Sequence, residues 1–254
     1  MDAISLTRSC RPAAVSALRW LFVAGLLWTA LYLAWLSLSR VDFLYPLWYE
    51  LLAIDQHIAR YAPQNYYKSG FETVAPAQHK ALFGQMLEAI NRGGQGLAEL
   101  SYRNADGETV ALLREPERVH LDSVALLVER LRRISYWLLG VLLASGIALG
   151  RLRLLPPRPL AMLAGASAGA AVMTAGILLY GAADVFSALH EWVFPPGEQW
   201  FFYYQESLMT TMLKAPDLFG ALAALLALTA LLWFVLLALA ARRLLQPPLG
   251  GAAP

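Results

Sequence analysis

Four long apolar runs constrain the possible folds of this chain more than any other feature of its sequence. The runs are 20–38, 134–150, 160–183 and 218–241. A helix needs roughly 20 apolar residues to cross the hydrocarbon core of a bilayer, and each run is close to that length. The composition agrees, because 58% of the 254 residues are hydrophobic and only 15% are charged. We therefore predict an all-α membrane protein whose four transmembrane helices are these runs.

The distribution of Lys and Arg predicts how the spans are oriented. The segments 1–19, 151–159 and 242–254 together carry eight arginines and one acidic residue, Asp2. The other twelve basic residues and seventeen acidic residues fall in 39–133 and 184–217 or at their edges. Because cytoplasmic flanks of transmembrane helices carry the excess of basic residues, both termini and the 151–159 connection are predicted to be cytoplasmic. Both larger loops are then extracytoplasmic.

The loop at 39–133 is long enough to form a small α+β subdomain between spans 1 and 2. Apolar residues recur at helical spacing in 41–61 and again in 76–90, which predicts amphipathic helices lying on the membrane. Alternating residues around Asn104–Gly107 predict a β-hairpin at about 97–114. From Glu115 a helical pattern continues without a breaker into the second span, so we expect one long helix there.

The loop at 184–217 is too polar to cross a bilayer and is rich in aromatic residues. Phe186, His190 and Phe194 recur every four residues, so they share one face of a helix. Aromatic side chains gather at the level of lipid headgroups, which predicts an interfacial aromatic loop between spans 3 and 4. An imidazole at that level, near Glu191 and Glu206, could transfer protons on a lipid-borne substrate.

Small residues mark the second and third spans. Gly165 and Gly169 lie four residues apart among alanines, and Gly146 and Gly150 repeat this spacing. Closely spaced glycines let helices approach each other in membranes. We therefore expect the third span to be tightly packed inside a helical bundle.

All four histidines fall in the two predicted outer loops, and two of them adjoin the outer ends of neighbouring spans. His120 precedes span 2 and His190 follows span 3. The nine-residue connection between these spans makes them antiparallel neighbours, so their outer ends can approach each other. The alternative is two unrelated histidines at polar helix ends. The same alternative holds more strongly for His57 and His79, which lie on the predicted amphipathic helices.

A metal site is a weaker hypothesis. Glu117 and His120 have the Glu-x-x-His spacing of carboxylate metal sites, and His190 could complete a set of three ligands. No HExxH motif or cysteine pair supports this set, so we expect no metal and no cofactor. A formal charge of +2 without alternating basic and aromatic residues also argues against a nucleic-acid partner.

Two blocks of residues resemble the family of integral membrane proteins that includes the bacterial lipoprotein intramolecular transacylase, Lit. The first block is Glu117, His120, Leu121 and Val124, at the start of the second span. The second block comprises Phe186, His190, Phe194, Pro195, Trp200, Phe202, Ser207, Leu208, Pro216 and Phe219. The resemblance extends from about residue 97 to the end of the fourth span.

The chain departs from the family pattern at two positions. The first block of the family has Asp before Val, where this chain has Ser123, with Asp122 one position earlier. In the second block Glu206 stands where Asp is expected before Ser-Leu. The segment 41–92 matches no part of the pattern.

The resemblance implies an acyl transfer from the sn-2 glyceryl ester of a membrane-anchored lipoprotein to the α-amine of its N-terminal cysteine. It implies a bacterial cytoplasmic (inner) membrane protein with its active site on the outer face. His120 and His190 would then be the catalytic acid and base, because imidazole can accept a proton from an α-ammonium near neutral pH.

Further residues would bind the diacylglyceryl lipoprotein and its lipid chains. Glu117, Asp122 and Glu206 would orient the imidazoles or the ammonium, and Phe194 and Trp200 would hold acyl chains, with Ser207 beside them. Two other functions stay open. One is a non-catalytic envelope protein that binds a lipoprotein or lipid, and the other is a metal-dependent membrane hydrolase using Glu117, His120 and His190.

Overall fold

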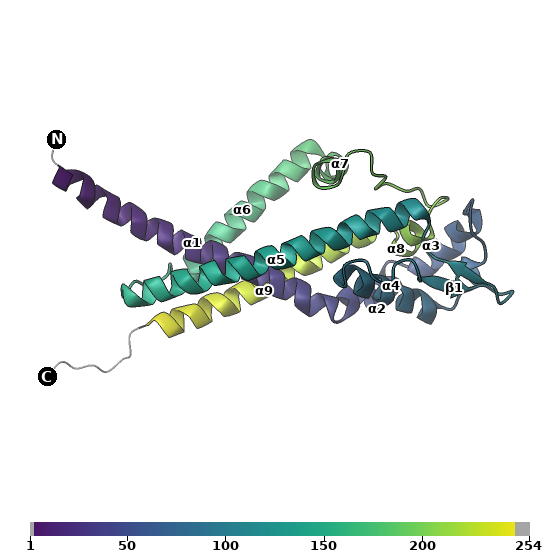
Figure 1. The fold of residues 1–254 in the computed structure, drawn as a ribbon, viewed down its shortest axis with the longest axis horizontal. Coiled ribbons are helices and arrows are strands. Elements are labelled where there is room, and N and C mark those ends of the chain that lie inside the picture. The colour runs from purple at the N-terminus through teal and green to yellow at the C-terminus, as the bar shows by residue number, and fades with distance from the viewer. Residues whose placement is uncertain (1–2, 247–254) are drawn as a thin grey trace. The chain divides into compact units, whose positions relative to one another are not determined.

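The computed structural model describes residues 3–246, and the side chains from Pro12 onward except that of Ala182. The side chains of Arg8 and Arg11, and residues 247–254 of the predicted cytoplasmic tail, therefore lie outside the described residues. The helices are α1 (Ala3–Ser39), α2 (Tyr45–Leu51), α3 (Ile54–Tyr61), α4 (Pro76–Asn91), α5 (Glu115–Arg151), α6 (Pro159–Tyr180), α7 (Ala182–Val193), α8 (Leu208–Leu213) and α9 (Asp217–Leu245) (Figure 1). Three short 3-10 helices are η1 (Asp42–Leu44), η2 (Ala62–Gln64) and η3 (Phe71–Thr73).

Four of these helices are long and apolar enough to cross a membrane. They are Pro12–Ser39 within α1, and the whole of α5, α6 and α9. The chain is thus mostly helical with four candidate membrane spans, as the apolar runs predict. The single helix α5 begins at Glu115 and continues to Arg151, which agrees with the uninterrupted helical pattern in the sequence.

The contacts divide the chain into two compact units. Unit 1 comprises Met1–Trp35, Arg133–Tyr180 and Ala227–Pro254, and unit 2 comprises Leu36–Arg132 and Gly181–Leu226. The helices of unit 1 are segments of α1, α5, α6 and α9. Unit 2 contains the shorter helices, the strands and all four histidines.

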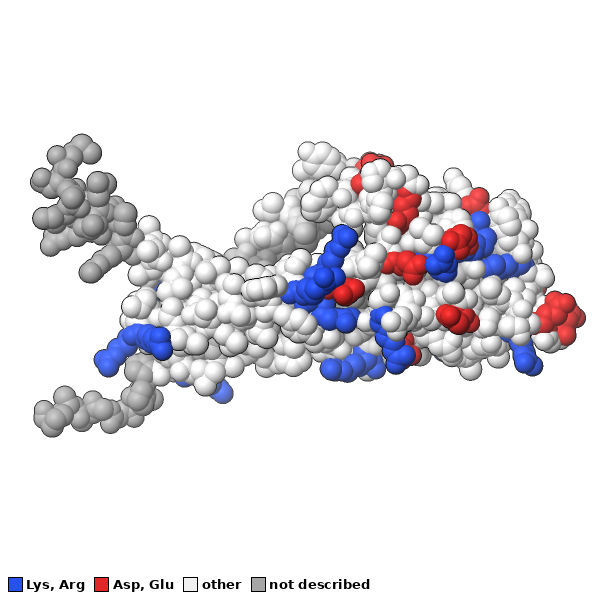
Figure 2. Space-filling model, in the orientation of Figure 1, with Lys and Arg blue, Asp and Glu red and all other residues white. Residues whose placement is uncertain are grey.

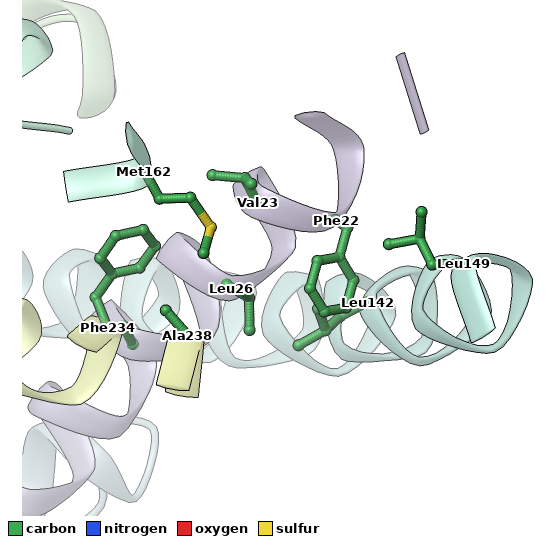
Figure 3. Close-up of a cluster of buried hydrophobic side chains, with 9 residues drawn as sticks. Phe22, Val23, Leu26, Leu142, Leu149, Met162, Phe234 and Ala238 are labelled. Atoms are coloured by element: carbon green, nitrogen blue, oxygen red, sulfur yellow. The ribbon is translucent and has the colours of Figure 1, made fainter. Parts of the chain in front are cut away.

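The core of unit 1 is a cluster of apolar side chains from its four helices (Figure 3). Phe22, Val23 and Leu26 of α1 meet Leu142 and Leu149 of α5, Met162 of α6, and Phe234 and Ala238 of α9. Close approach depends on glycine here, because a Cβ added at Gly25 would lie 3.0 Å from the Leu142 Cβ. A Cβ at Gly146 would lie 3.1 Å from the Phe22 ring.

The expectation that the third span is tightly packed is wrong. Most residues of α6 are exposed, and Met162 is the buried one among the described residues of this helix. A Cβ added at Gly169 would have no neighbour within 4 Å, and one at Gly165 would only touch Trp20 at 3.8 Å. Glycine spacing permits close helix packing but does not cause it, since close packing also needs a second helix that faces the glycines.

The small sheet of unit 2 lies where the alternating pattern predicts a hairpin. Strands β1 (Ser101–Arg103) and β2 (Thr109–Ala111) are antiparallel, and Tyr102 is opposite Val110. The Asn104 side chain accepts hydrogen bonds from the backbone N–H groups of Asp106 and Glu108, which stabilises the turn. Asn104 is therefore buried without an unmet acceptor.

The predicted single amphipathic helix at 41–61 is instead three short helices, η1, α2 and α3. Leu44 and Ala53 have left-handed backbones, with φ of 58° and 47°, and each interrupts the helical path. Tertiary contacts stabilise the breaks. Lys214 donates to the Leu52 carbonyl at 2.6 Å, and the Tyr45 hydroxyl donates to the Met212 carbonyl at 2.8 Å. Apolar periodicity does not reveal such long-range hydrogen bonds.

Charged side chains are concentrated on unit 2. In the space-filling view, Lys, Arg, Asp and Glu crowd its surface, whereas the described helices of unit 1 carry few charged side chains, all of them arginines (Figure 2). Uncharged helical surfaces are those that a hydrocarbon environment tolerates. Unit 1 therefore contains the membrane-compatible surface of the chain.

Candidate active site

Two histidines that are far apart in the sequence lie side by side in unit 2. His120 projects from the first turns of α5 and His190 from the last turn of α7, and their ring centroids are 6.1 Å apart. Gly181, with φ of 91°, interrupts the helical path between α6 and α7, a backbone conformation that glycine adopts readily. The structure thus brings together the two residues that the sequence only places at neighbouring helix ends.

The local helix fixes the proton position of His190. Its Nδ1 lies 2.8 Å from the carbonyl oxygen of Phe186, one turn earlier in α7. A carbonyl oxygen can only accept, so Nδ1 must donate. In the neutral ring the lone pair is then on Nε2, which makes this nitrogen the available base.

His120 has a different partner, a carboxylate. Its Nδ1 lies 2.9 Å from Oε1 of Glu198, and the Ser123 hydroxyl donates to Oε2 of the same carboxylate at 2.6 Å. His120 is 8% exposed, and the Glu198 side chain is 5% exposed. Again Nδ1 is directed to an acceptor, so Nε2 of the neutral ring is the free base.

Glu198 is not among the site residues predicted from the sequence, although a signal for it exists. It is the one acidic residue between Glu191 and Glu206, inside the aromatic loop itself. The Pro-Pro-Gly sequence before it is typical of a tight turn, which could direct the carboxylate back toward the histidines.

Aromatic rings surround the two imidazoles. Phe194 lies 4.7 Å from the His120 ring and 5.3 Å from the His190 ring, between centroids. Trp200 is 4.7 Å from His190, and buried Phe202 is 6.5 Å from His120. Phe186 completes the set at 4.0 Å from His190. The shared helix face is confirmed for Phe186 and His190, but Phe194 lies just beyond the end of α7 and has an extended backbone.

Glu117 and Ser207 form a separate buried network. The Glu117 side chain is fully buried, accepts a hydrogen bond from the Ser207 hydroxyl, and accepts another from the Arg114 backbone N–H at 2.6 Å. The Ser207 hydroxyl also caps α8 by accepting from the Thr210 N–H at 2.9 Å. Glu117 therefore contacts neither imidazole in this structure, because its oxygens are engaged elsewhere and Glu198 contacts His120. A role of Glu117 toward the substrate ammonium stays a prediction.

Asp122 and Glu206 do not contact a histidine either. Asp122 forms an ion pair with Arg118 at 2.8 Å, one turn earlier on α5. Its carboxylate also lies against Gly94, where a Cβ would come within 2.5 Å of it. Glu206 is half-buried, and its backbone N–H donates to the Tyr203 carbonyl at 2.9 Å. Within the part of the chain that the structure describes, no hydrogen bond or ion pair joins either carboxylate to an imidazole.

Two cations lie beside the buried Glu117 carboxylate. Arg114 Nε is 3.5 Å from Glu117, and its guanidinium carbon is 4.6 Å from the centroid of the Tyr67 ring. Lys68 donates to the Leu112 carbonyl at 2.7 Å. Burial lowers the pKa of the Lys68 ammonium to about 8; the nearby Glu117 opposes this shift and Arg114 adds to it.

The other two histidines, His79 and His57, pack against aromatic residues away from the candidate site. This agrees with the alternative that they are unrelated to it. His79 is buried, with Tyr49 Oη 2.8 Å from Nδ1 and the Phe71 carbonyl 3.2 Å from Nε2, and burial lowers its pKa. His57 contacts both Tyr61 and Tyr204, each 4.5 Å away between ring centroids. Burial, then the charge of Lys214, lowers the pKa of His57 to about 4.

A metal centre is not assembled from the predicted ligands. Among residues 3–246, as far as their side chains are described, no group of three His, Cys, Asp or Glu side chains is placed to hold an ion. Glu117, the third ligand of the metal-hydrolase hypothesis, is bound by Ser207 and Arg114 instead. The geometry around His120 and His190 is that of two bases in an aromatic site.

The comparisons with known proteins identify the fold. No family model matches the chain, and no curated protein matches it in sequence. Three solved structures match it, all of the membrane integral lipoprotein intramolecular transacylase Lit from Bacillus cereus.

Two of these structures contain a histidine substitution. The histidine-to-arginine variant is 13% identical, has a TM-score of 0.68, and the match covers 96% of each chain. The histidine-to-alanine variant has the same identity and TM-score over 94% of this chain and 96% of that one. A third structure is 14% identical, with a TM-score of 0.63 over 92% and 96%. The predicted resemblance is thus confirmed in three dimensions, and the chain has the fold of the transacylase Lit along nearly its whole length.

Proposed function

We propose that this protein is a membrane lipoprotein acyltransferase that transfers an acyl chain within its substrate. The acyl group would move from the sn-2 glyceryl ester of a diacylglyceryl lipoprotein to the α-amine of its N-terminal cysteine. The observation that carries this proposal is the pair of imidazoles 6.1 Å apart, each with Nδ1 held by an acceptor and Nε2 free. The Lit fold supports it.

Two free Nε2 atoms match the proton transfers that this reaction needs. An α-ammonium, with a usual pKa near 7.7 to 8.0, must lose a proton before its nitrogen can attack. One imidazole accepts that proton, and the amine then forms the new C–N bond at the ester carbonyl carbon. A second N–H proton passes through the other imidazole to the glycerol oxygen as the C–O bond breaks. The products are an amide, a free hydroxyl and one proton released to water.

The aromatic surroundings support an acyl substrate. Phe186 is 40% exposed, and Phe194 and Trp200 are only partly buried beside the imidazoles, so apolar surface remains for acyl chains. Amine and ester belong to one molecule, so binding has to fold the substrate into a reactive pose. High effective molarity then supplies much of the rate. No covalent enzyme intermediate is needed.

Mass spectrometry of a lipoprotein's N-terminal lipopeptide tests the proposal. Cells that present a diacylglyceryl lipoprotein with a free α-amine are compared with and without this protein. We expect an N-acyl cysteine with a lyso glyceryl group only in cells that contain it. An unchanged diacyl anchor would contradict the proposal and favour a protein that binds lipoproteins without acylating them.

Histidine variants then test the site. We expect His120→Ala and His190→Ala each to reduce the rate by roughly 10²- to 10⁴-fold, the usual contribution of general acid–base catalysis. His57→Ala is the matched control, because His57 lies in the same unit but contacts Tyr61 and Tyr204. Full activity of either catalytic variant, in folded protein, would remove that histidine from the mechanism.

A further inference from the structure

The turn after α7 places one carboxylate against the active-site pair. Pro195, Pro196, Gly197 and Glu198 form this turn, and the Glu198 N–H donates to the Pro195 carbonyl at 3.2 Å. Gly197 has φ of 82°, which the third residue of a type II turn requires, and a proline is favoured just before it. This local sequence therefore fixes the backbone from which the Glu198 side chain projects.

Both oxygens of the Glu198 carboxylate are used within unit 2. Oε1 accepts from His120 Nδ1 at 2.9 Å, and Oε2 accepts from the Ser123 hydroxyl at 2.6 Å. Ser123 is one turn beyond His120 on α5, so the two donors lie on the same helix face. A carboxylate that is only 5% exposed needs such partners, because burial without them is unfavourable.

The two imidazoles of the site consequently have unequal partners. Nδ1 of His120 contacts an ionisable carboxylate, whereas Nδ1 of His190 contacts the neutral Phe186 carbonyl. A carboxylate holds the ring in one tautomer and stabilises the imidazolium that forms when Nε2 takes a proton. A carbonyl fixes the tautomer but stabilises that positive charge less.

We propose that Glu198, braced by Ser123, is a positioning residue that makes His120 the proton acceptor of the reaction. The inference rests on the proposed function and assigns the two roles that it leaves open. Nε2 of His120 takes the first proton from the α-ammonium, and the resulting imidazolium later releases it to water. Nε2 of His190 transfers the second proton from the attacking nitrogen to the glycerol oxygen as the ester C–O bond breaks.

Glu198→Gln tests the assignment because glutamine keeps a carbonyl acceptor but removes the charge. We expect kcat for conversion of a diacylglyceryl lipopeptide to fall by roughly 10- to 100-fold, the value of a charge-assisted hydrogen bond, with little change in KM. Glu191→Gln is the matched control. Glu191 is an exposed carboxylate beside His190, and its loss should leave kcat within about twofold.

The pH–rate profile separates positioning from a purely structural role. The charged or titratable side chains in contact with the His120 ring are Glu198 from the turn and His190 from α7. Glu117 lies one turn earlier on α5, bound to Ser207. Loss of the Glu198 charge should move the acidic limb of the profile to lower pH, and Glu198→Asp should restore its position. Ser123→Ala should reduce kcat severalfold without moving the limb.

Nitrogen NMR of the labelled His120 ring decides the inference even if the protein makes no N-acyl product. We expect Nδ1 to be protonated at neutral pH in the wild type and in Glu198→Gln, which keeps a carbonyl acceptor, and a mixture of tautomers in Glu198→Ala, which has no acceptor. A wild-type ring protonated on Nε2, or a Glu198→Gln variant with unchanged rate and pH profile, would overturn it. A wild type without transacylase activity but with the expected tautomer would contradict the proposed function and leave the positioning contact supported.

Discussion

Units 1 and 2 have interiors of different chemistry. The cluster at the centre of unit 1 consists of apolar side chains such as Phe22, Leu142 and Phe234. The interior of unit 2 includes Glu117 and His120, and most other buried polar side chains also lie in that unit. Apolar packing tolerates many arrangements of similar volume, whereas a buried polar group is stable only with its own partner. In unit 2, the loss of a single hydrogen-bonding group is therefore expected to destabilise the fold. This unit also contains the candidate site.

The largest expected effect on stability is the loss of the Glu117 carboxylate. Glu117→Ala leaves the Ser207 hydroxyl and the Arg114 backbone N–H without their acceptor, and it leaves the Arg114 guanidinium without its ion-pair partner. We expect unit 2 to lose about 3–5 kcal/mol of unfolding free energy, as when one partner of a buried ion pair is removed. Hydrogen exchange in detergent micelles measures the two units separately.

The control for this experiment is Glu115→Ala, two residues earlier on α5. Its side chain is 70% exposed and forms an ion pair with Arg118, an interaction worth at most about 1 kcal/mol. Equal destabilisation by Glu115→Ala and Glu117→Ala would contradict the stabilising role of buried polar partners within unit 2.

A second prediction concerns the close packing of helices in unit 1. Gly146→Leu places a side chain against the Phe22 ring, where even a Cβ would lie 3.1 Å away. We expect about 1–3 kcal/mol of destabilisation from this overpacking, measured as a lower thermal unfolding midpoint. Gly169→Leu adds the same side chain to α6 where no atom lies within 4 Å, so its midpoint should not fall.

A third prediction concerns the break between α2 and α3. Lys214→Met removes the ammonium that donates to the Leu52 carbonyl at 2.6 Å but keeps an apolar side chain of similar length. We expect about 1–1.5 kcal/mol of destabilisation, since the carbonyl loses its partner near the surface. Faster hydrogen exchange of the α3 backbone amides would report this destabilisation. Unchanged exchange there would mean that other contacts stabilise the interruption between α2 and α3.

The smallest expected effect per pH unit and per residue is a pH dependence confined to unit 2. The folded-state pKa of His79, and that of His57 at about 4, lie below the usual value of 6.5. The unfolded chain therefore binds more protons than the folded chain below pH 6.5, and stability falls as pH decreases toward the folded-state pKa. Each histidine contributes at most about 1.4 kcal/mol per pH unit.

Unit 1 is the internal control for this titration, because it contains no histidine and its one acidic residue is Asp2. Hydrogen exchange between pH 7 and 5, corrected for intrinsic rates, should show destabilisation of unit 2 alone. The slope should decrease in His79→Gln, which keeps a donor and an acceptor for Tyr49 and Phe71. An equal slope in both units would contradict the assignment to these histidines.

The accuracy of the sequence predictions differs between helices and side-chain partners. The four spans, the continuous α5 and the strands around Asn104 were all predictable, because each depends on a pattern within about 40 residues. The break at Leu44 and Ala53 was not, since it depends on hydrogen bonds to the Met212 carbonyl and from Lys214, both of which lie far along the chain. Likewise the exposure of α6 depends on which helices face it, which glycine spacing does not encode.

The sequence by itself determined the membrane-spanning character, the helical content and the identity of the two histidines of the candidate site. It did so because apolar length and helical spacing are local properties of the chain. Only the tertiary structure decided which carboxylate contacts which histidine. Glu117 is three residues from His120 yet binds Ser207, whereas Glu198, 78 residues away, contacts the ring. The physical reason is that the backbone of the turn before Glu198 and of the first turn of α5 sets the direction in which each carboxylate projects. A buried carboxylate is stable only where its oxygens accept hydrogen bonds from nearby donors.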